Sequence, residues 1–496
     1  MSDRTLPPIT SVTGGSGGLA ATYDRVRDLA DDFDGAGNRM RAWAGAGART
    51  LGNGDLIESA PLSPLTFADA ELSVLAATTG PRGILPHSAG WEADAVVVRA
   101  TVAAFDVTDQ IVRASFEAID YAIGLQAGFL IGRGAALSPA LLPVLARPLL
   151  AGVTAYGLYR ALPPHLRREL SDAAGDLSAP ARRRLCNWLA ANPEVLQHAM
   201  NGGGGLLDGL ALGAGAPLAV PGLAPFHPSA NDAAGSLAGL LDDGRPVVSR
   251  RPDLDPESSP PPRNLQELLA NLDRLNELSD QDHPENNGTI QIQQLGSGEE
   301  RRYIVYLPGT DVMNPLAAGG EHTRDMLANG RLVDGEQTTH GRGVLEALRQ
   351  AGVPPDAPLL LAGHSQGGMQ AAHLAATDSG YHVTDVVVAG APTAQVPSLP
   401  GHVSLLALEN AGDIVPLTDG EDSPDQPNRT TVRFDQHEPE VLDNHDLHHY
   451  VAGAAAVDAS GHPSITSALD HLRTNGFLTG HDSAAVTTTF QVTRAH

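Results

Sequence analysis

The stretch that decides the fold runs from residue 359 to residue 375 and reads LLLAGHSQGGMQAAHLA. Its first four residues are apolar and predict a short buried strand, and the Ala-rich residues from Gln366 onward predict a helix. Between them lies Gly363-His364-Ser365-Gln366-Gly367, a G-x-S-x-G pentapeptide. A serine at such a corner takes a strained conformation that projects its hydroxyl above the sheet edge, beside the N–H groups of the helix. The sequence therefore predicts that Ser365 is a nucleophile, with a purely structural turn as the alternative.

Strands and helices alternate on both sides of this corner, from residue 264 to the C-terminus. Short apolar strands alternating with helices are typical of the α/β class, in which helices cover both faces of a mostly parallel sheet. The expected strands are 289–295, 302–307, 358–362, 383–389, 403–408 and 430–434, and the expected helices are 265–278, 342–352, 366–377, 445–457 and 463–474.

The second requirement of serine chemistry is a histidine that takes the hydroxyl proton, oriented by a carboxylate. Asp413 is the candidate acid because it follows the expected strand 403–408. Asp419 and Asp385 are the alternatives, although Asp385 opens a strand and Asp419 lies farther from a strand end.

Several histidines after Asp413 compete for the role of base. His445 is the candidate because it lies at the first turn of an expected helix and can point back toward the sheet edge, with His448 as the main alternative. The group also includes His437 and His449.

A metal site is a competing interpretation of this histidine group, because Asp443 and Asp446 lie beside it and His and Asp ligate zinc or iron. No second, separated group of ligands is evident in the sequence. Serine chemistry needs neither a metal nor an organic cofactor, and we expect none.

The third requirement is a pair of donors for the oxyanion. The expected strand 302–307 ends in Pro308-Gly309-Thr310-Asp311, and glycine there allows close backbone approach. The candidate donors are the N–H groups of Thr310 and Gln366. Residues 311–340 are rich in Gly and lack strong periodicity, which predicts a mobile flap over the site.

Taken together, these stretches resemble the α/β-hydrolase superfamily and, more narrowly, lipase- and esterase-like hydrolases common in actinobacteria. The resemblance spans about residues 263–496 and implies a triad of Ser365, Asp413 and His445, with the Thr310 loop forming half of the oxyanion hole. It implies hydrolysis of carboxylic esters, of lipids or other acyl compounds, through an acyl-enzyme. The stretches that carry it are YIVYLPGTD (303–311), LLLAGHSQGGMQAAHLA (359–375), VVVAGAPTA (386–394), LALENAGDIVPLTDG (406–420) and NHDLHHYV (444–451).

The composition excludes several other functions. All 32 basic residues are arginine, so chemistry that requires a lysine, such as Schiff-base catalysis or a phosphate-loop lysine, is absent. The net charge of −26 argues against nucleic acid as a partner. The single cysteine excludes an intrachain disulfide.

The N-terminal half has a different sequence pattern, which is typical of helices. Apolar residues at helical spacing from Leu19 to Trp43, and again from Trp91 to Ile123, predict two long amphipathic helices. We expect a mostly helical region at 1–249, a Pro/Ser-rich linker at 250–263 and the α/β domain at 264–496. A Gly-rich loop is expected from Gly202 to Pro228.

Residues 121–162 are nearly free of charge, but Arg133 and Arg147 and three prolines interrupt them. The longest uncharged run is shorter than the ~20 residues that a membrane-spanning helix needs. We therefore expect buried helices and no integral membrane span, with a membrane-dipping hairpin as the alternative.

Trp43-Ala44-Gly45 is similar to the W-x-G motif of helical domains exported by ESX (type VII) secretion. This resemblance implies either a secreted effector whose hydrolase-fold module is auxiliary or inactive, or a secretion partner bound by the helices. A cytoplasmic enzyme that uses the helices as a cap or for homodimerisation is the other interpretation. The N-terminus has no ordinary signal peptide, so we expect a cytoplasmic protein or one exported without signal cleavage.

Overall fold

The chain forms two compact units in the computed structural model. One comprises residues 1–18 and 116–496, and the other comprises residues 19–115. The structure describes residues 6–137, 193–213, 227, 229–239, 241–279, 283–312, 319–436, 438, 443–479 and 485–496.

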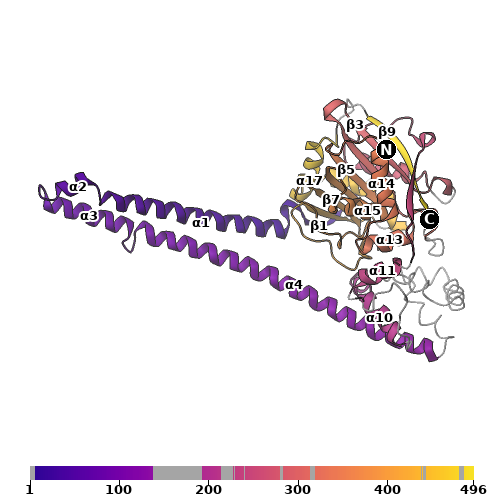
Figure 1. The fold of residues 1–496 in the computed structure, drawn as a ribbon, viewed down its shortest axis with the longest axis horizontal. Coiled ribbons are helices and arrows are strands. Elements are labelled where there is room, and N and C mark those ends of the chain that lie inside the picture. Colours follow the sequence, from indigo (N-terminus) through magenta and orange to yellow (C-terminus); the bar gives the residue numbers. More distant parts are fainter. Residues whose placement is uncertain are drawn as a thin grey trace. The chain divides into compact units, whose positions relative to one another are not determined.

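The larger unit contains one mixed sheet, which confirms the predicted α/β class (Figure 1). The nine strands found in the described part of the chain lie in the order β1-β8-β7-β6-β5-β4-β3-β9-β2. The five from β4 to β8 are parallel, and antiparallel strands flank them on both sides. The bounds are β1 Ile9–Gly14, β2 Arg245–Arg250, β3 Thr289–Leu295, β4 Arg302–Leu307, β5 Leu359–His364, β6 Val383–Ala389, β7 Ser404–Asn410, β8 Arg429–Phe434 and β9 Ala485–Ala495.

Helices pack on both faces of this sheet because its central strands are mostly apolar and buried and alternate side chains point to opposite faces. Val305 of β4 joins a core with α14 and α15, and the next residue, Tyr306, joins a second core with α12, α16 and α17. The bounds are α12 Leu265–Asn276, α13 Met326–Val333, α14 Thr339–Gln350, α15 Gln366–Ala376, α16 Leu447–Asp458 and α17 Pro463–Thr474.

The predicted boundary between residues 249 and 264 is not where the chain divides. β1 and β2, from the expected helical region, pair with β8 and β9 of the sheet. Within the expected linker, Asp255 accepts a hydrogen bond from the backbone N–H of Thr489 at 2.8 Å, and Pro261 and Pro262 are buried. The proline-rich composition gives an extended segment, but this segment lies packed against the sheet.

The smaller unit confirms the prediction of long helices. α1 (Leu19–Thr50) runs beside α4 (Ile84–Leu137), which continues into the larger unit after residue 115, and α2 (Gly54–Ser59) and α3 (Pro64–Thr78) lie between them in the chain (Figure 1). The apolar side predicted for the second long helix is not buried, because Phe105 and Ile119 are 53% and 54% exposed. The rings of Phe33 and Trp91 contact each other between the two long helices in a tilted arrangement, with centroids 4.9 Å apart. Trp43-Ala44-Gly45 lies inside α1, which continues to Thr50.

Three further helices belong to the larger unit: α9 (Pro193–Asn201), α10 (Gly203–Gly213) and α11 (Ala230–Ala238). α10 corrects the expectation of a loop from Gly202, because these glycines allow close helix packing. A Cβ at Gly205 or Gly209 would collide with the backbone of α4 at Tyr121 or Leu125. Residues 138–192 and 214–226, which hold most of the charge-poor segment, lie outside the described residues. None of the described helices is long and apolar enough to cross a membrane.

The segment predicted to be a mobile flap, residues 311–340, contains α13 and the start of α14. Buried ion pairs anchor the described residues of this segment. Arg324 is fully buried and pairs with Asp311 at 2.8 Å, and Arg494 of β9 pairs with Asp325 at 2.8 Å. The sequence contained no sign of these pairs, because the first depends on the complete burial of Arg324 and the second joins Asp325 to a strand 169 residues away.

Candidate active site

Ser365 occupies the corner between β5 and α15 with a φ of 52°, and no other non-glycine residue described has a positive φ. Its N–H donates to the carbonyl of Ala389 on β6 at 2.9 Å. The flanking glycines are required by space, because a Cβ at Gly367 would collide with the carbonyl of Leu307, and one at Gly363 with that of Gly367. The strained corner expected from the pentapeptide is therefore present.

Asp413 and His445 lie together beyond the carboxyl ends of β7 and β8. His445 Nδ1 lies 2.7 Å from Asp413 Oδ2, and the carboxylate also accepts from the Tyr450 hydroxyl at 2.5 Å and the Val415 N–H at 2.9 Å. Burial raises the pKa of Asp413, but His445 and these hydrogen bonds outweigh it and hold the pKa below its ordinary value. Because a carboxylate only accepts, His445 carries its proton on Nδ1 and leaves Nε2 available.

The alternative acids have other partners. Asp419 accepts the N–H of Ala394 at 2.7 Å, and burial raises its pKa to about 7. Asp385 pairs with His471 at 2.7 Å near the start of β6, at the opposite edge of the sheet.

The alternative bases do not face Asp413. His448 is exposed, and its ring lies tilted against that of the buried His449 with centroids 3.9 Å apart. His437 lies outside the described residues.

His364 connects the nucleophile to the acid–base pair. This residue precedes Ser365, its ring lies 4.7 Å from that of His445 between centroids, and its Nε2 donates to the His445 carbonyl at 2.9 Å. Burial, followed by the nearby His445, lowers the pKa of His364 to about 3, which keeps the ring neutral. The Ser365 hydroxyl itself makes no hydrogen bond with any described residue, and such bonds are often long in unliganded sites.

The loop after β4 lies directly against the nucleophile. A Cβ added at Gly309 would stand 3.2 Å from Ser365 Cβ and 3.3 Å from His364 Nδ1. Arg324 donates to the Gly309 carbonyl at 2.8 Å. Because the carbonyl and the following N–H of a trans peptide point in opposite directions, the Thr310 N–H is turned away from Arg324.

The two candidate oxyanion donors are both available. Within the described part of the chain, neither the Thr310 N–H nor the Gln366 N–H has a hydrogen-bond acceptor. Gln366 opens α15, where the first N–H groups of a helix lack intrahelical acceptors. The side chains of Thr310 and Gln366 both form a hydrogen bond with Asn329.

Sequence reasoning missed the supporting residues Tyr450, His364, Arg324 and Asn329. Tyr450 lies in the stretch 444–451, but nothing in that stretch indicates that its hydroxyl reaches Asp413. No signal existed for Arg324, because its role depends on complete burial beside the loop after β4.

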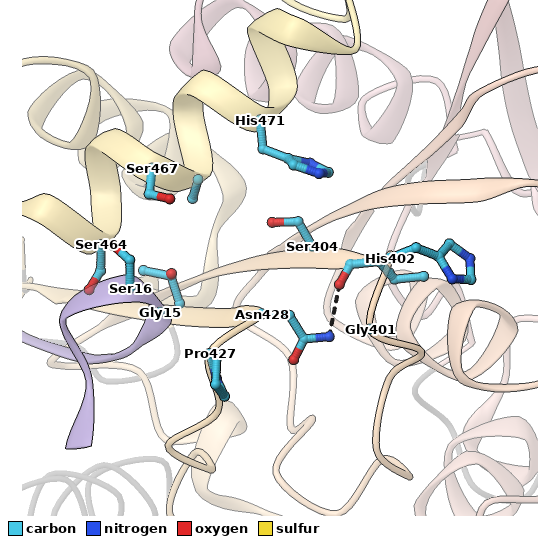
Figure 2. A pocket seen from close by; sticks show the side chains of 13 residues that line it. Gly15, Ser16, Gly401, His402, Ser404, Pro427, Asn428, Ser464, Ser467 and His471 are labelled. Atoms are coloured by element: carbon cyan, nitrogen blue, oxygen red, sulfur yellow. Dashed lines mark hydrogen bonds between the residues drawn. The ribbon is translucent and has the colours of Figure 1, made fainter. Parts of the chain in front are cut away.

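A small cavity of about 180 Å³ lies at the opposite edge of the sheet, near the amino ends of β7 and β8 (Figure 2). Its lining includes His402, Ser404, Asn428 and His471. None of the five candidate site residues lines it, so it is separate from the Ser365 region.

No three His, Cys, Asp or Glu side chains of the described residues converge where they could hold a metal ion. Asp443 and Asp446 are exposed, and Asp413 Oδ2 is already engaged by His445 and Tyr450. Comparisons of the chain with protein-family models, with curated proteins and with solved structures found no match.

Proposed function

We propose that this chain is a serine hydrolase that cleaves carboxylic esters through an acyl-enzyme. The observation that carries the proposal is the strained Ser365 corner at the same end of the sheet as the Asp413–His445 pair. Ser365 follows β5, Asp413 follows β7 and His445 follows β8, all at the carboxyl ends of parallel strands. Strain at a single non-glycine residue persists only where its surroundings enforce it, and it is concentrated at functional sites.

In the proposed mechanism, the Ser365 hydroxyl attacks the ester carbonyl while His445 Nε2 takes its proton. Asp413 holds the imidazole in the Nδ1–H tautomer and stabilises the imidazolium that forms. The N–H groups of Thr310 and Gln366 donate to the oxyanion. Collapse expels the alcohol, which receives the proton from His445, and water then attacks the acyl-enzyme by the same route.

We propose acyl or lipid esters as the substrate class, on the basis of the resemblance to lipase-like hydrolases. Two features favour a site closed to bulk water: Ser365 is 9% exposed, and Asp413 is 4% exposed. A low-dielectric site strengthens the interaction of the oxyanion with its donors.

The proposal is tested on the full chain with a fluorophosphonate probe and a panel of acyl esters of increasing chain length. We expect labelling at Ser365 and ester turnover, both abolished in Ser365→Ala with little change in melting temperature. In Ser365→Gly, turnover is lost as well, but the free energy of unfolding rises by about 1 kcal/mol relative to Ser365→Ala because glycine tolerates a φ of 52°. Unlabelled wild-type protein without turnover would refute the proposal.

A second candidate function is an interaction protein in which the helical hairpin at residues 19–115 carries the activity. On α1, Leu29 and Trp43 are 47% and 59% exposed, and on α4 Phe105 is 53% exposed. Phe105 stacks on Tyr23 with centroids 6.2 Å apart but still keeps this exposure, so the hairpin leaves apolar surface open.

We propose that a second copy of the chain covers this face. Asp32 and Arg39 are exposed, lie one turn from Leu29 and Trp43, and form no ion pair with a described residue. Two antiparallel α1 helices place each Asp32 opposite the partner's Arg39, which gives two symmetric ion pairs beside the apolar contact.

The oligomeric state of the full chain in sedimentation tests this second proposal. We expect a dimer that Asp32→Arg or Arg39→Asp weakens and that the double exchange restores, whereas Asp470→Arg, at an exposed site of the other unit, has no effect. A wild-type monomer at tens of micromolar would refute it.

A further inference from the structure

Asn329 of α13 lies between the two residues whose backbone N–H groups are the candidate oxyanion donors. Its side-chain Nδ2 donates to the Thr310 hydroxyl at 3.2 Å, and its Oδ1 accepts from the Gln366 side chain at 2.8 Å. One amide therefore connects the loop after β4 with the first residue of α15.

The Gln366 side chain is held by a second hydrogen bond besides the one to Asn329. Its Nε2 also donates to the carbonyl of Asp325, the residue before α13, at 2.7 Å, and Gln366 is only 1% exposed. Thr310 is half-buried, and among the described residues its side chain forms a hydrogen bond with Asn329 alone. The orientation of the Thr310 loop thus depends on Asn329 from one side and on Arg324 from the other.

α13 itself is held by tertiary contacts that fix where Asn329 stands. Asp325 accepts the N–H of Ala328 at 3.0 Å and caps the helix, and Arg494 holds the same carboxylate from β9. On the outer side, Gly330 lies against Ala238 of α11. These contacts on both sides of α13 fix the position of Asn329 relative to the sheet.

We propose that Asn329 is a positioning residue that sets the spacing and direction of the two oxyanion donors, an inference that rests on the proposed serine hydrolase function. Asn329 acts through Thr310 and Gln366 and is not itself required to touch the substrate. Oxyanion stabilisation requires donors pre-set about 2.7–3.1 Å from the developing charge, so a small displacement of either N–H lowers the rate.

The test compares Asn329→Ala, Thr310→Val and the double variant in the full chain, with kcat expressed per serine labelled by a fluorophosphonate. Removing one oxyanion donor outright typically lowers kcat by about 10²–10³-fold. We expect Asn329→Ala, which only displaces the donors, to lower kcat by about 10-fold or more. KM should change by less than about 3-fold, because the lost interaction belongs to the transition state.

The double variant separates positioning from a general structural effect. If Asn329 acts through Thr310, the losses in the two single variants are not additive, and the double variant is little worse than Asn329→Ala. Asn428→Ala is the matched control, because this half-buried asparagine also makes two hydrogen bonds, at 2.9 and 3.1 Å, but at the opposite edge of the sheet (Figure 2). We expect it to leave kcat unchanged.

The outcomes distinguish this inference from the proposed function. If the wild type hydrolyses esters and Asn329→Ala has the same kcat per labelled serine, the positioning role alone is overturned. Strictly additive losses in the double variant would also overturn it. Absence of labelling and turnover in the wild type would instead overturn the hydrolase proposal on which it rests.

Discussion

The hydroxyl of Tyr450 donates at 2.5 Å to Oδ2 of Asp413, the same carboxylate oxygen that faces His445 Nδ1 at 2.7 Å. Tyr450 comes from α16, and Asp413 comes from the loop after β7. The phenol is buried, so this bond is shielded from water and holds the acid from the side opposite the Val415 N–H. Tyr450 therefore ties the helix after the candidate base to the candidate acid.

Tyr450→Phe is expected to make the protein more sensitive to acid. A carboxyl whose pKa is lowered in the folded state adds stability that is present above its unfolded pKa, ~3.9, and is lost as the pH falls through the folded value. Removing one donor raises the pKa of Asp413 in the folded state, so unfolding begins at a higher pH, and stability at neutral pH falls by about 1–3 kcal/mol. Acid titration followed by circular dichroism measures both. Tyr381→Phe, just before β6, is the control, and identical acid midpoints in the two variants would contradict the expectation.

Gly309→Ala tests the close approach of the loop after β4 to the nucleophile. The added methyl stands 3.2 Å from Ser365 Cβ and 3.3 Å from His364 Nδ1, distances at which the loop or the corner has to shift. We expect kcat for ester hydrolysis to fall at least about 10-fold, since each 1.4 kcal/mol of lost transition-state stabilisation is tenfold. Gly401→Ala is the matched control because its Cβ meets nothing within 4 Å. Equal kcat values in the two variants would rule out this effect.

Arg494→Met tests the buried charges that support α13. The Arg494 side chain is 0% exposed and pairs with Asp325 at 2.8 Å and Asp243 at 2.9 Å. Removing one partner of a buried ion pair leaves an uncompensated charge and costs about 3–5 kcal/mol. Urea unfolding measures this loss, and Arg473→Met, in an exposed pair with Asp470, is expected to change the free energy of unfolding by about 0.5 kcal/mol or less. A similar small change in both variants would show that the pair is not stabilising.

Asp419→Asn distinguishes the two candidate acids and has a pH signature of its own. Burial raises the pKa of Asp419 to about 7. Between its unfolded pKa, ~3.9, and this value, the folded state binds more protons than the unfolded state, so stability falls as the pH rises through that window. Asparagine does not titrate, so the variant lacks this pH dependence. We therefore expect the difference in free energy of unfolding, variant minus wild type, to be on the order of 1–3 kcal/mol larger at pH 8 than at pH 4.

Ester turnover completes the comparison between the two aspartates. Asp419→Asn is expected to retain wild-type kcat, whereas Asp413→Asn is expected to lose about 10³–10⁴-fold because the His445 tautomer is no longer held. The reverse pattern would reassign the acid to Asp419.

Much of the central sheet was predictable because most of its strands are short stretches of apolar or β-branched residues, several of them bounded by turn residues. The predicted segments 289–295, 302–307 and 383–389 match β3, β4 and β6 residue for residue. The helices at 265–278 and 463–474 were also found within two residues of their bounds. The edge strands β1 and β2 were missed, because they are short, exposed and pair with segments hundreds of residues away.

The candidate site also has features that were predictable from local sequence and features that were not. The glycines around Ser365 are a local requirement of a tight turn, and the sequence alone was sufficient to predict the strained corner found there. The position of Asp413 after a strand was likewise readable from local pattern. Which histidine faces that carboxylate was left open between His445 and His448 and was decided by the three-dimensional arrangement.

By itself, the sequence determined the parallel strands, the Ser365 corner and the helices that cover the sheet, since apolar periodicity and glycine placement act within a few residues. Only the tertiary structure decided that Arg324, Asn329 and Tyr450 support the candidate site. The reason is physical: their effect depends on burial and on a partner from a distant segment, and neither is specified by the residues adjacent in the chain.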